Sequence, residues 1–66
     1  MLNFSRKLRV YLAENNIKKK DFAIEIGVSP ETISNWLHDK VKINRLHAIG
    51  VDTVTEGQIT MSDMGY

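Results

Sequence analysis

The sequence has no cysteine, one proline, few aromatic residues and no apolar run long enough to cross a bilayer. Without cysteine there is no disulfide framework and no thiolate metal site. This composition is consistent with a reducing cytoplasm, and no secretory pattern opens the chain, because polar and basic residues interrupt the first apolar ones. At 66 residues we expect one domain with a small core, which a partner or a second copy would help to stabilise.

Basic residues are also missing from one part of the chain. All nine Lys and Arg residues lie between Arg6 and Arg45 together with five acids, so this part carries a formal charge of +4. Residues 46–66 contain three acids and no Lys or Arg, which gives them a formal charge of −3. A basic body with an acidic tail is compatible with a protein that binds a polyanion and associates through another surface, although small proteins also show such asymmetry by chance.

The stretch 19–38, KKDFAIEIGVSPETISNWLH, predicts two short helices. Apolar residues at helical spacing stop at Gly27, and a second set starts after Ser29-Pro30. Gly27 tolerates a positive φ, Ser29 has the chemistry of an N-cap, and Pro30 suits the first helical position. Two helices joined by a turn of about four residues form a helix-turn-helix, in which the second helix enters the major groove of DNA.

The outward side chains of the second helix, 30–38, can contact base edges. Asn35 can pair with adenine N6 and N7, Glu31 can accept from cytosine N4, and the Thr32 methyl group can touch a thymine methyl. Glu31 also suits the dipole at its helix N-terminus, and a polar surface role is the alternative for each of these residues. The candidate base-contacting residues are Glu31, Thr32, Ser34, Asn35 and His38.

Cations gather where helices are expected to begin. Three consecutive lysines open the first helix of the motif, where they oppose the helix dipole, and a bound phosphate would gain from both the lysines and the exposed N–H groups. Further along, the loop 39–43 has no strong turn residue, and Asn44 can cap the next helix. A solvated charged surface is the alternative. The candidate phosphate-contacting residues are Lys18, Lys19, Lys20, Lys40, Lys42, Asn44 and Arg45.

A helix is also predicted over 4–14, before the motif. Asn3 can cap its start, Asn15-Asn16 can end it, and Ile17 would tuck under the turn. The basic residues of this helix are expected to be solvated. Inside the motif, Ala23, Ile33 and Trp36 are expected in the core. The apolar face of the first helix consists of Phe4, Leu8, Tyr11 and Leu12.

After the motif the pattern is less regular. A helix is predicted from Arg45 to about Thr55, with Gly57 near its end, although Gly50 and several β-branched residues lower the helix propensity. One face of this helix carries Leu46, Ile49 and Thr53, with Val54 near it.

The last residues leave two structures open. Residues 58–61 alternate like a short strand, whereas Thr60 and Asp63 have the spacing of a cap and first turn of a one-turn helix. The apolar side chains of this tail either close the core or form a dimerisation surface over 56–66.

The motif resembles the lambda-repressor-like and Cro-like DNA-binding domains. The pattern A-x-x-x-G-V-S-x-x-T-I-S-x-W runs from Ala23 to Trp36, and T-x-G-x-I-T-x-x-D-M, from Thr55 to Met64, is similar to the ending of short phage and prophage regulators of the Cro type. The resemblance implies an all-α, compact domain of four to five helices over 1–66. Two positions depart from the family: Lys19 replaces a Gln, and Pro30 replaces a polar reader.

The resemblance further implies a homodimer that binds a pseudo-palindromic operator in double-stranded DNA through the helix 30–38. We therefore expect a sequence-specific transcriptional regulator, a Cro-like phage or prophage repressor in the cytoplasm, without a cofactor, membrane or small-molecule substrate. The alternative is an antitoxin-like protein-interaction module. An enzyme is disfavoured because the only histidines, His38 and His47, occur without cysteine or a phosphate loop.

Overall fold

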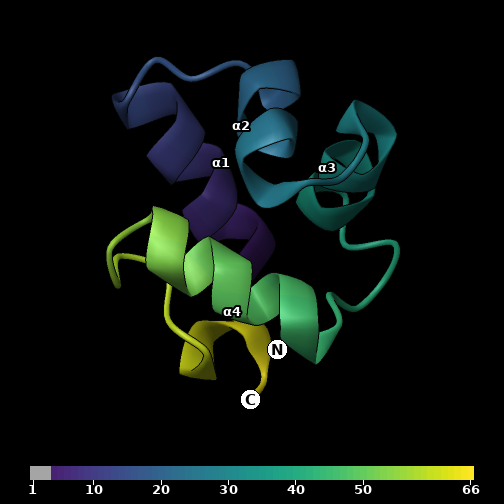
Figure 1. The fold of residues 1–66 in the computed structure, drawn as a ribbon, viewed down its shortest axis with the longest axis vertical. Coiled ribbons are helices and arrows are strands. Elements are labelled where there is room, and N and C mark those ends of the chain that lie inside the picture. Colours follow the sequence, from purple (N-terminus) through teal and green to yellow (C-terminus); the bar gives the residue numbers. More distant parts are fainter. Residues whose placement is uncertain (1–3) are drawn as a thin grey trace.

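The computed structural model describes residues 4–66, which fold into α-helices and one short 3-10 helix, with no strand in this range (Figure 1). The two helices of the motif occupy the upper part of the view in Figure 1, the last α-helix crosses below them, and the 3-10 helix lies beneath it. The all-α prediction is confirmed. The elements are α1 (Phe4–Glu14), α2 (Lys19–Ile26), α3 (Pro30–Leu37), α4 (Arg45–Val54) and η1 (Ser62–Met64).

The first helix ends as its sequence predicts. Asn16 adopts a left-handed conformation with φ 55°, and the Ile17 amide then donates to the Leu12 carbonyl at 2.9 Å. Ile17 is half-buried and packs against the core. The proposed cap Asn3 lies outside the described residues.

The basic residues of α1 are exposed, as expected, but two of them bind other elements. Lys7 Nζ lies 3.0 Å from Asp63 Oδ2, and Arg9 Nη2 donates to the Leu37 carbonyl at 3.0 Å. The first bond ties α1 to the C-terminal tail, and the second ties it to the end of α3.

The core lies where the four α-helices meet. Ala23 is 1% exposed, and this small side chain allows close packing where α2 meets its neighbours. Ile33 and Trp36 are buried as the sequence predicts. The buried apolar residues of the described part are Phe4, Leu8, Leu12, Phe22, Ala23, Ile33, Trp36, Ile43, Ala48, Val51, Ile59 and Met64.

The last α-helix buries a different face from the one that the sequence pattern marks as apolar. Its buried side chains are Ala48 and Val51, followed by Thr55 just beyond the helix end. Thr55 Oγ1 donates to the Val51 carbonyl at 2.8 Å, which satisfies a buried hydroxyl. Leu46 and Ile49 are exposed instead, because they lie on the side of α4 opposite Ala48 and Val51.

The C-terminal tail forms the one-turn helix, and the strand alternative is wrong. Thr60 and Asp63 make a reciprocal cap: Thr60 N donates to Asp63 Oδ2 at 2.9 Å, and Asp63 N donates to Thr60 Oγ1 at 3.2 Å. Ile59 and Met64 are buried, so this tail closes the core. Tyr66 remains 42% exposed, and its hydroxyl donates to the Ile43 carbonyl at 2.7 Å.

Gly50 is the place where α4 can be strengthened. A Cβ there would meet only Ile26 Cγ2, at an ordinary 4.0 Å. Because glycine is unfavourable within a helix, Gly50→Ala should raise the free energy of unfolding by roughly 0.5–1 kcal/mol. Gly27→Ala is the matched comparison and should lower it by about 1–2 kcal/mol, since Gly27 has φ 90°. Urea denaturation measures both, and equal effects would contradict this assignment.

Acid should weaken the tail. The Thr60 amide and the Lys7 ammonium both stabilise the charged form of Asp63 and lower the pKa of its carboxyl below the ordinary value. The resulting stabilisation is therefore present above the unfolded pKa of about 3.9 and is lost as the pH falls through the lower, folded pKa. Asp63→Asn should be less stable than the parent at pH 7, and this difference should shrink below about pH 4. A difference that stays constant with pH, measured by urea denaturation, would refute the prediction.

Candidate nucleic-acid interface

The turn between α2 and α3 is built from residues 27–29, one fewer than the sequence predicts. Gly27 has φ 90°, and its amide donates to the Ala23 carbonyl at 2.8 Å. The Val28 amide donates to the same carbonyl at 3.0 Å. These two bonds end α2 and reverse the chain within a few residues.

The third helix then starts at a side-chain cap, as predicted. The Thr32 amide donates to Ser29 Oγ at 3.3 Å, and the two hydroxyl oxygens of these residues lie 3.0 Å apart. Pro30 occupies the first turn, where its missing N–H leaves no bond unmade. The direction in which α3 leaves the turn is thus fixed by local bonds.

Aromatic packing holds the inner face of α3. The Trp36 ring lies 5.9 Å from the Phe4 ring of α1 and 5.9 Å from the His47 ring of α4, measured between centroids. Ile33, one turn before Trp36, is fully buried. The opposite face of α3 therefore points away from the domain.

That opposite face holds the residues that the sequence nominates for base contacts. Glu31 and His38 are exposed, whereas Thr32, Ser34 and Asn35 are half-buried. Together these side chains form what we call the α3 outer face. It consists of Glu31, Thr32, Ser34, Asn35 and His38.

Two of these side chains have partners within their own helix. The Thr32 hydroxyl is paired with Ser29, which leaves its methyl group for an apolar contact. His38 Nδ1 donates to the Ser34 carbonyl at 2.8 Å, so Nε2 is the ring nitrogen that remains for another molecule.

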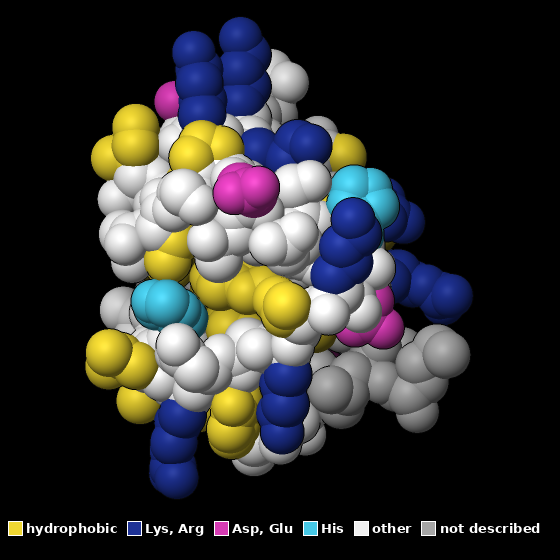
Figure 2. Space-filling model, turned by 90° about the vertical axis from the view of Figure 1, so that its right-hand side faces the viewer, with side chains coloured by type: hydrophobic (Ala, Val, Ile, Leu, Met, Phe, Trp, Pro, Cys, Tyr) yellow, Lys and Arg dark blue, Asp and Glu magenta, His cyan; other side chains and the backbone are white. Residues whose placement is uncertain are grey.

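Basic side chains surround this face. Figure 2 shows the side of the molecule on which α3 lies, with Lys and Arg at its top, right and lower edges and only scattered acidic side chains. The exposed cations next to the motif come from two segments, the start of α2 and the connection from α3 to α4. They are Lys18, Lys19, Lys20, Lys40, Lys42 and Arg45.

The connection from α3 to α4 is more ordered than its sequence suggests. Asp39 supplies the missing turn residue with φ 56°, and the Lys40 amide donates to the Asn35 carbonyl at 2.9 Å. Asn44 Oδ1 accepts from the His47 amide at 2.8 Å, which confirms Asn44 as a cap and leaves its amide nitrogen for other contacts. Because aspartate tolerates the left-handed conformation, Asp39 was a turn signal already present in the sequence.

Two residues outside the predicted site support this connection. Tyr66 holds the Ile43 carbonyl through its hydroxyl, and its ring lies 4.8 Å from Lys42 Nζ. The chain end therefore helps to place a cation beside α3. Only tertiary structure brings these residues together, because they are far apart in the sequence.

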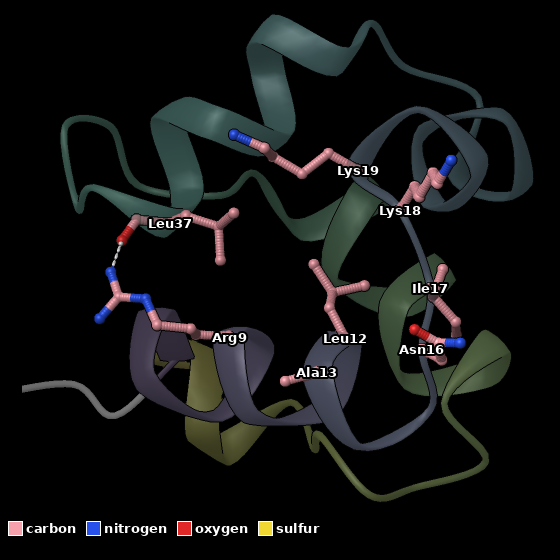
Figure 3. Close-up of a pocket in the computed structure, with 8 residues that line it drawn as sticks. All are labelled: Arg9, Leu12, Ala13, Asn16, Ile17, Lys18, Lys19 and Leu37. Carbon is pink, nitrogen blue, oxygen red and sulfur yellow. Dashed lines mark hydrogen bonds between the residues drawn. The ribbon is translucent and has the colours of Figure 1, made fainter.

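A cleft of about 450 Å³ adjoins the start of α2 (Figure 3). Figure 3 shows Lys19 extending from α2 over this cleft, toward the side where Arg9 is bonded to the Leu37 carbonyl. Apolar side chains, including Leu12 and Ile17, line its floor. Lys19 thus extends toward the end of α3, where Arg9 is a further cation that the sequence analysis left out.

None of the cations around α3 forms an ion pair with another described residue. The one ion pair in residues 4–66 joins Lys7 to Asp63, on another part of the surface. The same residues contain no cluster of three His, Asp or Glu side chains that could hold a metal ion. No helix within residues 4–66 has the length and apolar character needed to cross a membrane.

A comparison with known protein families identifies the family to which this helix-turn-helix belongs. The family described as Cro/C1-type HTH DNA-binding domain matches residues 7–50, which is more than half of the chain and includes α2, the turn and α3. The chain belongs to this family. Comparisons with curated proteins and with solved structures gave no match. The helix-turn-helix predicted from the sequence is therefore a Cro/C1-type DNA-binding domain, as the resemblance implied.

Proposed function

We propose that this Cro/C1-type domain is a sequence-specific transcriptional regulator, a Cro-like phage or prophage repressor that binds a pseudo-palindromic operator as a homodimer. The observation that supports this proposal is the α3 outer face, a set of short polar side chains between two groups of exposed cations. A helix of this kind fits the major groove, while the cations contact the phosphates on either side. Occupation of the operator would then exclude polymerase or a competing regulator.

The α3 outer face supplies the sequence preference in this proposal. Asn35 pairs with adenine, Glu31 accepts from a cytosine amine, and Thr32 offers its methyl group to thymine because its hydroxyl is already bonded to Ser29. Ser34 and His38 lie one turn apart at the far end of the helix. His38 contributes through Nε2, since Nδ1 is bonded to its own helix.

The cations supply affinity without sequence preference. Lys18, Lys19 and Lys20 meet one strand of the duplex at the start of α2, where the helix N-terminus adds its own attraction for phosphate. On the other side of α3, the connection to α4 contributes the second group. Its members are Lys40, Lys42, Asn44 and Arg45.

The fold gives no support to the antitoxin-like alternative. A tail that is disordered alone and folds on a partner would favour it. The tail residues Ile59 and Met64 are instead buried in the domain's own core. The buried tail residues therefore do not favour the antitoxin-like alternative.

Two substitutions separate base reading from phosphate binding. With a duplex selected from a random library, Asn35→Ala should reduce discrimination at one base pair by about 1–3 kcal/mol and leave the salt dependence of binding almost unchanged. Arg45→Ala should weaken binding to all sequences alike and reduce the slope of log K against log salt by about one.

Fluorescence anisotropy at several salt concentrations measures both quantities. Lys7→Ala is the control for the second variant, because Lys7 is paired with Asp63 away from α3 and its loss should change the slope little. Identical behaviour of Asn35→Ala and Arg45→Ala would show that the division into readers and phosphate contacts is wrong.

A further inference from the structure

The cleft of about 450 Å³ beside the start of α2 has the size of a small-molecule site (Figure 3). Such sites usually enclose about 300–1,000 Å³ and combine an apolar lining with a few polar groups. The lining here comes from α1, from the segment that leads into α2 and from the end of α3. We call it the α1–α2 cleft. Its apolar side chains are Leu12, Ile17 and Leu37, and its cations are Arg9, Lys18 and Lys19.

The apolar side chains of the cleft are only partly covered by the domain itself. Leu12 is buried in the core, whereas Ile17 and Leu37 are half-buried and pack against its edge. Ala13, also in the lining, is exposed and too small to fill the space. An apolar body placed in the cleft would remove the remaining surface of these side chains from water, which favours binding.

The ionisable side chains that line the cleft all carry positive charge. Figure 3 shows Lys19 extending toward the end of α3, on the side where Arg9 lies. The Arg9 guanidinium is held there because Nη2 donates to the Leu37 carbonyl at 3.0 Å. A guanidinium has five N–H donors, so this bond leaves others for an anion. A cleft lined by charges of one sign attracts ions of the opposite sign.

Two smaller clefts on the described surface differ in their charge. The cleft of about 270 Å³ includes Asp39 beside Lys40, and the cleft of about 250 Å³ includes Glu14 beside Arg6. The acidic side chain in each weakens its attraction for an anion. Of these three clefts, the α1–α2 cleft therefore combines an apolar floor with positive charge that no acidic lining residue opposes.

We propose that the α1–α2 cleft binds a small amphipathic organic anion, a carboxylate with an aliphatic body, as an effector. The carboxylate lies between Arg9 and Lys19, where it accepts charge-assisted hydrogen bonds. The aliphatic body covers Leu12 and Ile17. Neither part of the ligand is sufficient alone, because the cations stand at the rim and the apolar side chains form the floor.

An anion in this cleft opposes the binding of DNA. This part of the inference rests on the proposed function, in which Lys18 and Lys19 contact phosphates of the duplex. A carboxylate held by Lys19 neutralises charge that a phosphate would otherwise meet. By linkage, the anion and the duplex each lower the affinity for the other by the same factor.

Octanoate tests the site without DNA. The ¹⁵N-labelled chain is titrated with octanoate below its micellar concentration, with acetate, which lacks the aliphatic body, and with octylammonium, which has the opposite charge. Octanoate should change the amide chemical shifts of 12–19 and Leu37 saturably and bind at least about tenfold more tightly than either control. Equal binding of octylammonium, or octanoate changes concentrated at the exposed Leu46 and Ile49 of α4, would overturn the proposal.

Three variants locate the binding. Ala13→Glu adds a carboxylate to the lining at an exposed helical position and should weaken octanoate binding by about tenfold or more. Lys19→Gln should weaken it by about threefold or more, because one of the two cations on the carboxylate is lost. Arg6→Gln is the matched control: Arg6 is an exposed cation of α1 that lines another cleft, and its loss should leave the octanoate affinity unchanged. The site is refuted if Ala13→Glu binds octanoate like the parent, or if Arg6→Gln loses as much as Lys19→Gln.

Fluorescence anisotropy with a duplex selected from a random library tests the competition. Saturating octanoate should lower the parent's affinity for the duplex by about tenfold relative to the same concentration of acetate, which matches the ionic strength. Ala13→Glu should show no such response. An unchanged duplex affinity in saturating octanoate would refute the competition. If the parent selects no duplex, the proposed function fails, while the octanoate titration still decides whether the cleft is a site.

Discussion

The burial of Trp36 is the interaction on which the rest of this structure depends. Its ring contacts Phe4 of α1 and His47 of α4, so one side chain joins α3 to the helices before and after the motif. An isolated helix as short as α3 would not be stable in water. The packing of its inner face, together with the cap at Ser29, therefore gives the outer face of α3 a defined direction.

The C-terminal tail extends this constraint to the connection between α3 and α4. Ile59 and Met64 close the core below α4, and the reciprocal cap between Thr60 and Asp63 holds the tail in place. From there Tyr66 reaches the Ile43 carbonyl, beside the cations that follow α3. The tail thus supports the domain through the buried side chains of Ile59 and Met64 and through the hydrogen bond of Tyr66.

Local chemistry could be predicted from the sequence, whereas packing partners could not. Gly27, Ser29 and Asn44 each act as predicted because a positive φ or a cap depends on the residue itself and its nearest neighbours. The sequence pattern did not reveal which face of α4 is buried, because the side of a helix that is covered depends on elements distant in sequence. The residues of the α3 outer face could be nominated from helical spacing alone. The hydrogen bonds from Arg9 to Leu37 and from Tyr66 to Ile43 could not, because they join residues distant in sequence.

The most direct test of the account is a nuclear magnetic resonance titration of the ¹⁵N-labelled chain with a duplex selected from a random library. The account predicts that the largest changes in amide chemical shift occur along 30–38, at the start of α2 and over 40–45, with small changes in the middle of α1 and in the tail. Changes concentrated in α1 or the tail, with the α3 residues unaffected, would contradict the claim that α3 reads the DNA.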